Sequence, residues 1–96
     1  MEQNIQLKHP DGKKAVSMNK VKYDTLKKAL LHHLKKKGES THAEICQTVT
    51  EDFKKNKIKF EGSIPWHMEW VKLDLEASKI IERVPKTSPL KYALAK

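Results

Sequence analysis

The spacing of apolar residues along the chain predicts three helices. The first covers about residues 20–37, where apolar side chains recur every three or four positions. The second covers about residues 42–55 and the third about residues 64–79, each with apolar positions at the same spacing. The residues of the three stripes are Tyr23, Leu26, Leu30 and Leu34, then Ile45, Cys46, Val49 and Phe53, then Trp66, Trp70, Leu73 and Ala77.

Polar residues mark the beginning of each predicted helix. Asn19 is suited to cap the first helix. Thr41 and Glu44 stand three residues apart, which matches a capping box at the start of the second. Ser63 precedes the third helix, and Pro65 falls in its first turn, where a missing amide proton costs nothing. The three boundaries are therefore predicted from local chemistry as well as from periodicity.

Alternation of apolar and polar residues predicts strands at both ends of the chain. Residues 4–18 alternate on either side of the turn sequence His9-Pro-Asp-Gly12, which is typical of a β-hairpin. Near the C-terminus, residues 80–84 and 90–94 flank the turn Pro85-Lys-Thr-Ser-Pro89. These two runs predict a two-stranded wing that follows the third helix.

The order of these elements predicts one α+β domain over residues 1–96, with a hairpin, three helices and a wing. A loop over residues 56–62 joins the second helix to the third, and we expect its Ile58 and Phe60 to pack against the core. A chain of this length buries only a small core, so a partner subunit would add to its stability.

Three stretches of the chain resemble the winged helix-turn-helix superfamily. They are Thr41-His-Ala-Glu-Ile-Cys-Gln47, Trp70-Val-Lys-Leu-Asp-Leu-Glu-Ala-Ser-Lys-Ile-Ile-Glu-Arg83 and Pro89-Leu-Lys-Tyr-Ala-Leu94. The full pattern, with its N-terminal hairpin and its tryptophan-bearing third helix, is also similar to a group of small bacterial proteins of about this length whose function is not established. The resemblance implies a winged-helix fold. It leaves function open, because winged helices serve both DNA binding and protein association.

The charge of the chain points to a polyanionic partner. Twenty basic residues stand against 12 acidic ones, a formal net charge of +8, and the excess lies mostly in the first 40 residues. Arg83 is the only arginine. Because base-edge reading in the major groove favours the bidentate guanidinium, this composition predicts phosphate contacts rather than sequence reading.

The residues expected to contact double-stranded DNA lie on the third helix, the wing and the hairpin turn. They are Lys72 and Lys79, then Arg83, Lys86, Thr87, Ser88 and Lys91, then Lys13 and Lys14. On the third helix, Glu69 and Glu76 alternate with Lys72 and Lys79, which disfavours base reading by that helix. For each cluster the alternative is a solvated lysine surface that binds nothing.

The third helix carries apolar residues on two sides. Trp66 and Trp70 belong to one side, and Met68, Val71 and Leu75 to nearly the opposite one. One interpretation is that both tryptophans fill the core between the third helix, the hairpin and the wing. The other is that Trp66, Met68 and Trp70 form an interface with a second copy of the chain or with another protein.

Catalytic and metal chemistry are not expected. The glycines are scattered, so no phosphate-cradling loop is present. Cys46 lies on an apolar stripe, as an inert buried thiol does, and His42 at i,i+4 lacks the further ligands that zinc needs. We expect no catalytic residue, metal or cofactor. Because the sequence has neither a long apolar run nor a signal peptide, we expect a cytoplasmic protein without membrane contact.

Two functions therefore remain. The first, which the charge favours slightly, is a small DNA-associated regulator that binds phosphates. The second is a protein-association or dimerisation module that does not bind DNA.

Overall fold

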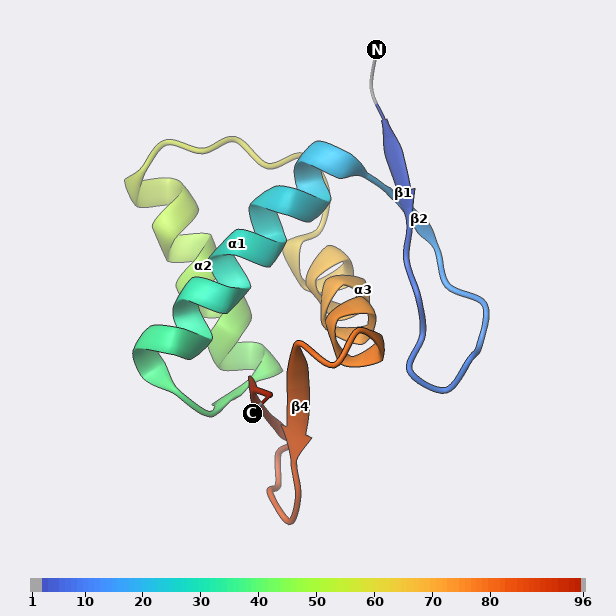
Figure 1. Ribbon diagram of the computed structural model, residues 1–96. Helices are drawn as coiled ribbons and strands as arrows, with labels where there is room; N and C mark the ends of the chain where they lie inside the picture. Colours follow the sequence, from blue (N-terminus) through green and yellow to red (C-terminus); the bar gives the residue numbers. More distant parts are fainter. Residues whose placement is uncertain (1–2, 96) are drawn as a thin grey trace.

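The computed structural model describes residues 3–95, and its elements follow in the predicted order (Figure 1). They are β1 (Asn4–Gln6), β2 (Ser17–Asn19), α1 (Lys20–Lys37), β3 (Ser40–Thr41), α2 (His42–Lys55), α3 (Ile64–Ala77), β4 (Ile81–Val84) and β5 (Lys91–Leu94). Helices α1 and α2 have the predicted bounds. Helix α3 ends two residues earlier than predicted, and each wing strand begins one residue later.

The predicted helix caps are confirmed. Asn19 accepts a hydrogen bond from the Lys22 amide at 3.1 Å. At the start of α2, the Thr41 amide donates to the Glu44 carboxylate at 2.9 Å, and the Glu44 amide donates to the Thr41 hydroxyl at 3.1 Å. Both partners of the capping box thus satisfy an amide that the helix itself leaves free.

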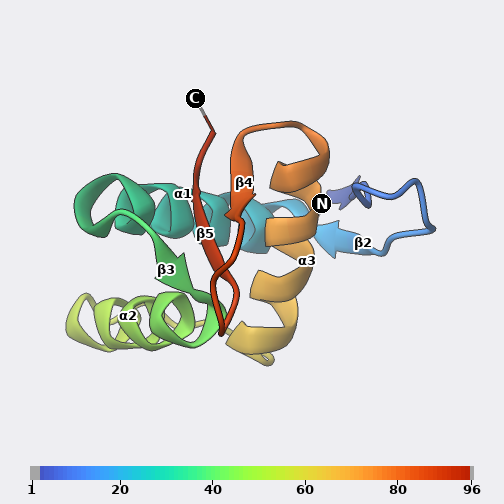
Figure 2. The ribbon, with the colours of Figure 1, turned by 90° about the horizontal axis from the view of Figure 1, so that it is seen from below.

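A three-stranded antiparallel sheet closes one end of the helices, in the order β3-β5-β4 (Figure 2). Strand β3, which was not predicted, pairs Ser40 with Tyr92 and Thr41 with Lys91. It has only two residues, and its pairing joins segments about fifty positions apart in sequence. The sequence α1-β3-α2-α3-β4-β5 is a winged-helix architecture, so the predicted fold class is confirmed.

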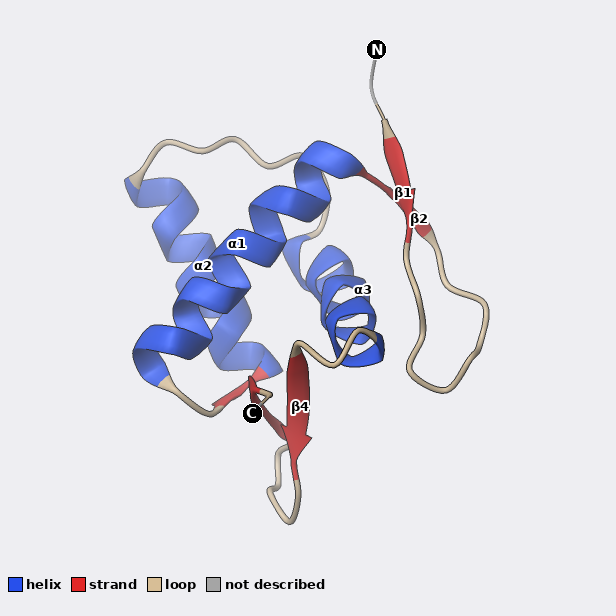
Figure 3. Ribbon diagram, viewed as in Figure 1, coloured by secondary structure: helices blue, strands red, loops and turns tan. Residues whose placement is uncertain are grey.

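The N-terminal hairpin packs beside α1 and α3, on the side away from α2 (Figures 1 and 3). Leu7 and Met18 of the hairpin are buried in the core. Asp74 of α3 fixes the hairpin in place. The carboxylate of Asp74 accepts a hydrogen bond from the Lys8 amide of the hairpin at 3.0 Å and another from the Tyr23 hydroxyl of α1. Burial, reinforced by Asp74, raises the pKa of Tyr23, so its hydroxyl remains a donor.

The core lies among the three helices and is closed by Ile81 and Tyr92 of the sheet. Phe60 packs against this core, as predicted. The same prediction for Ile58 is wrong, because its side chain is 43% exposed. Ile58 follows the end of α2 in the loop over residues 56–63.

Candidate nucleic-acid interface

The wing turn presents an exposed cation and an exposed hydroxyl, Lys86 and Ser88. Thr87 has a different role from the predicted one. Its hydroxyl donates to the Val84 carbonyl at 2.9 Å and accepts from the Lys91 amide at 3.0 Å. These bonds close the turn, so the Thr87 hydroxyl shapes the wing and is not free for a phosphate.

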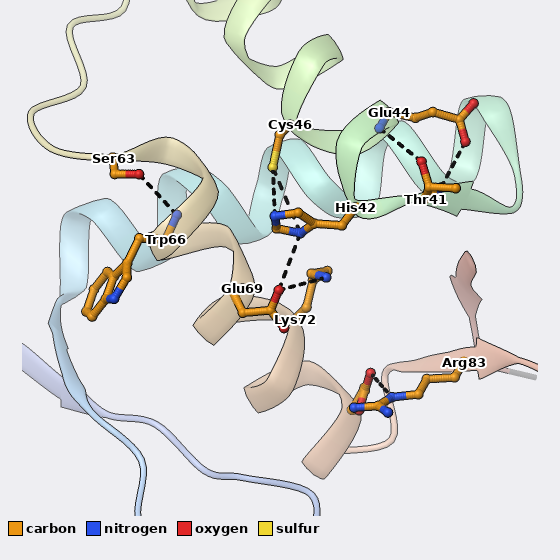
Figure 4. Close-up of polar contacts among 10 residues, drawn as sticks. Thr41, His42, Glu44, Cys46, Ser63, Trp66, Glu69, Lys72 and Arg83 are labelled. Carbon is orange, nitrogen blue, oxygen red and sulfur yellow. Dashed lines mark hydrogen bonds and ion pairs between the residues drawn. The ribbon is translucent and has the colours of Figure 1, made fainter. Parts of the chain in front are cut away.

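Arg83 lies on β4 with its charge already balanced. Its Nε donates to the Glu76 carboxylate of α3 at 2.9 Å, and this hydrogen bond raises the pKa of Arg83 (Figure 4). The pair was not predicted. The two residues stand seven positions apart across the end of a helix, a spacing that carries no local signal.

The hairpin turn lies against the end of α3 and the base of the wing. Lys13 and Lys14 line one hollow together with Ala77 of α3. Pro10 of the same turn lines a second hollow together with Lys79 and Arg83. The hairpin turn and the wing also extend toward the same end of the molecule (Figure 1). The hairpin turn thus lies close to the end of α3, where Lys79 and Arg83 are found. We group these cations with Lys86 of the wing turn under the name wing–hairpin surface, which consists of Lys13, Lys14, Lys79, Arg83 and Lys86.

Lys72 does not belong to this surface, and its predicted contact with DNA is wrong. Its side chain is 1% exposed, with Nζ 3.4 Å from the Glu69 carboxylate and 3.9 Å from the centroid of the Tyr92 ring. Burial lowers the pKa of Lys72, and Glu69 opposes that shift. Strand β5 places Tyr92 over the side of α3 that was predicted to be solvated. The ammonium is therefore enclosed within the protein.

Glu69 links this buried lysine to the start of α2 (Figure 4). Its carboxylate lies 3.7 Å from His42 Nδ1, and His42 Nε2 lies 3.5 Å from the thiol of Cys46. Burial lowers the pKa of His42 and raises that of Cys46. Both groups are thus neutral near pH 7, and the thiol is a poor nucleophile. Between residues 3 and 95 no group of three His, Cys, Asp or Glu side chains is placed to hold a metal ion.

The predicted protein interface on α3 is reduced to one exposed residue. Met68 is fully buried in the core, so its assignment to an interface is wrong. Trp70 is half-buried against the core, whereas Trp66 is 49% exposed. The centroids of the two indole rings lie 6.4 Å apart, and the rings meet edge to face at an interplanar angle of 60°. Trp66 is therefore the residue of this set that is open to a partner.

The fold and its surface define a small α+β protein of winged-helix architecture with an added N-terminal hairpin and an excess of exposed lysine. Residues 4–92 match the model of a family described as "Family of unknown function (DUF6958)", and the chain belongs to this family. No curated protein and no solved structure matches the chain. Among the described residues, no helix is both long and apolar enough to cross a membrane.

Proposed function

We propose that this protein is a non-catalytic, cytoplasmic DNA-associated module, in the manner of a small transcriptional regulator, that binds duplex phosphates through the wing–hairpin surface. One observation carries the proposal. Four of the five cations of that surface, Lys13, Lys14, Lys79 and Lys86, are exposed and form no ion pair with any residue of the described chain. Unpaired lysines release condensed counterions from DNA without first breaking an internal contact.

The surface of α3 argues against base reading by this helix. Its buried Lys72 cannot reach a groove, and the carboxylate of Glu69 is half-exposed on the same helix. A carboxylate there repels phosphates. The exposed Trp66 cannot form bidentate hydrogen bonds with the edge of a base. Affinity should therefore depend little on sequence and steeply on salt. With four free lysines, the logarithm of the binding constant should fall with the logarithm of salt concentration with a slope of about −4.

Two lysines offer variants that separate charge from folding. Lys79 and Lys86 both have φ +61°, a left-handed conformation in which glycine is free of strain. Lys79→Gly and Lys86→Gly therefore remove a charge while favouring the native backbone. Lys57→Gly is a matched control, because Lys57 has φ +55° but lies in the loop after α2.

The test is fluorescence anisotropy of a labelled random duplex at low and at near-physiological salt. We expect binding that weakens with salt, and each of Lys79→Gly and Lys86→Gly should reduce the salt slope by about 1. Lys57→Gly should leave the slope unchanged. An absence of binding at low salt would overturn the proposal, and so would an equal loss in all three variants.

A second candidate function is protein association through Trp66, including formation of a homodimer. The observation that favours it is an indole 49% exposed on α3, since tryptophan is enriched at interface hot spots. The molar mass of the wild type and of Trp66→Ala, measured by light scattering, tests it. A dimer that dissociates in the variant supports this candidate, whereas a monomeric wild type or an unaffected dimer argues against a Trp66-mediated dimer.

A further inference from the structure

A groove runs along α1, between that helix, the end of α2 and the loop after it. Two adjoining hollows form the groove, and both are lined by Thr25 and Ile58. The first begins at Asn19, and the second reaches His32. We call this feature the α1–α2 groove. The loop that forms part of its wall passes the beginning of α1 (Figure 1).

The groove exposes apolar side chains that the core does not use. Val21 is 72% exposed and Ile58 is 43% exposed, and both line the first hollow. Phe60 lies beside them, with Nζ of Lys22 5.6 Å from its ring centroid. Large apolar residues that share one concave surface are typical of a binding groove rather than of a lysine surface that only keeps a protein in solution.

The two segments that form the groove carry much of the chain's positive charge. Residues 19–32 and 52–61 contain eight lysines against three acidic residues, a net charge of +5 out of +8. The lining of the groove itself holds three lysines, Lys22, Lys28 and Lys59, and two carboxylates, Asp52 and Glu61. Of the eight, only Lys20 forms an ion pair, with Asp24, within residues 3–95. A molecule that fills the groove therefore needs apolar groups that contact the floor of the groove and carboxylates that contact the lysines at its rim.

The length of the groove fits one helix. From its cap Asn19 to His32, α1 rises about 20 Å at about 1.5 Å per residue, which matches a partner helix of about 14 residues. Such a helix presents apolar side chains at i, i+3, i+4 and i+7 on one face. Its opposite face and flanks would carry the acidic residues.

We propose that the α1–α2 groove docks an acidic amphipathic helix of a partner protein. Nucleic acid fits it less well, because a phosphate backbone does not cover the exposed Val21 and Ile58. The lining residues of the groove include none from the wing–hairpin surface, so one molecule could engage DNA and the helix together. The proposal does not depend on DNA binding.

The test uses a fluorescein-labelled peptide of about 14 residues, with leucine at i, i+3, i+4 and i+7 and glutamate at most other positions. Anisotropy should show saturable binding by the folded protein, and a scrambled peptide of the same composition should bind about tenfold more weakly. Ile58→Glu should weaken binding about tenfold, because it places a carboxylate on the groove floor. Lys28→Glu should weaken it by reversing a rim charge, and Lys86→Gly is the control outside the groove.

Each outcome decides the proposal. Loss in Ile58→Glu and Lys28→Glu, with the control unchanged and the amide resonances of residues 19–32 and 52–61 shifted on titration, supports it. Both substituted side chains are exposed, so the variants should fold, and circular dichroism is the measurement that checks this. No binding, equal binding of the scrambled peptide, or displacement of the peptide by duplex DNA from the same resonances would overturn it. The last result would make the groove a nucleic-acid site.

Discussion

Removal of the Glu69 carboxylate should destabilise the fold through its effect on Lys72. At 3.4 Å, the two charges attract by about 5 kcal/mol at an effective dielectric constant of about 20, and by about 1 kcal/mol in bulk water. Glu69 is 49% exposed, so the interaction lies between these limits. We expect Glu69→Gln to cost about 2–3 kcal/mol. Without Glu69, the buried Lys72 ammonium can lose its proton instead of staying charged. The free energy of this deprotonation limits the cost to about 4 kcal/mol near pH 7.5.

Substitution of Lys72 itself should be nearly harmless. Lys72→Met keeps an unbranched chain of similar length under the Tyr92 ring while it removes the buried charge. Replacing a buried charge by an apolar group of similar volume is typically neutral or stabilising by about 1–4 kcal/mol. In the Lys72→Met background, Glu69→Gln should cost less than about 0.5 kcal/mol, because the charge that needed compensation is gone.

The assay is urea unfolding of the four proteins of this cycle, followed by tryptophan fluorescence near pH 7.5. At that pH His42, whose pKa burial lowers, is neutral and adds little to the cost of losing Glu69. Equal losses from Glu69→Gln in both backgrounds would show that the pair is not coupled and would refute the reasoning. A strongly destabilised Lys72→Met would show instead that the ammonium contributes more than its desolvation costs.

The pH dependence of stability gives an independent check. The pKa of Lys72 is lowered in the fold from the ordinary value of 10.5, so above its folded pKa the unfolded chain binds more protons than the native state. The stability of the wild type relative to Lys72→Met should therefore rise as the pH increases toward about 10.5. Tyr23 and Tyr92, whose pKa values are raised by burial, act in the opposite sense and are present in both proteins. A difference that does not vary with pH would contradict the assignment.

Four further substitutions test the framework, each by chemical denaturation. Asp74→Asn should cost about 2 kcal/mol, because one carboxylate serves both the hairpin amide and the Tyr23 hydroxyl, and Tyr23→Phe should cost less. Gly62→Ala should cost about 1–2 kcal/mol, since a Cβ would lie 2.9 Å from His67 at φ +103°, and an unchanged midpoint would show that the loop adapts. Thr41→Ala should cost about 1 kcal/mol, because it removes the capping box at the beginning of α2. A neutral effect would show that other contacts fix the beginning of this helix.

The helices could be predicted because their signals are local. A stripe of apolar residues and a capping side chain lie within one or two turns of each other, so α1 and α2 begin and end where the sequence indicates. The end of α3 was less predictable. Lys79 stops the helix in a left-handed conformation that glycine usually supplies, and Ile80 then donates to the Leu75 carbonyl at 2.9 Å. No residue type at that point indicates in the sequence that the helix ends.

The burial of Lys72 shows where local reasoning fails and what signal was present. The prediction assigned Lys72 to a polar stripe with Glu69 and Glu76, whereas the structure covers it with Tyr92 from a strand twenty residues later. Yet Lys72 follows Met68 by four positions and precedes Leu75 by three, so it lies within the stripe that the core buries. Its position in this stripe, given more weight than its residue type, would have predicted the burial of Lys72. The coverage by Tyr92 depends on strand packing and has no local signal.

Two of the three left-handed lysines connect stability with the wing–hairpin surface. Each residue of the described chain that has a positive φ and is not glycine is a lysine: Lys57, Lys79 and Lys86. A side chain in this conformation costs roughly 1 kcal/mol relative to glycine. A residue that carries such a cost is expected where its charge contributes to binding, and the three lie at the loop after α2, the end of α3 and the wing turn.

This argument predicts opposite effects from one triple variant. Lys57→Gly/Lys79→Gly/Lys86→Gly should raise the melting temperature, because each change relieves a strained backbone and together they contribute up to about 3 kcal/mol. The same protein should bind duplex DNA more weakly than the wild type, with a salt slope reduced by about 2 from the two positions on the wing–hairpin surface. A triple variant that is more stable and binds DNA equally well would remove Lys79 and Lys86 from any role in DNA binding. One that is less stable would show that their side chains contribute packing that outweighs the strain.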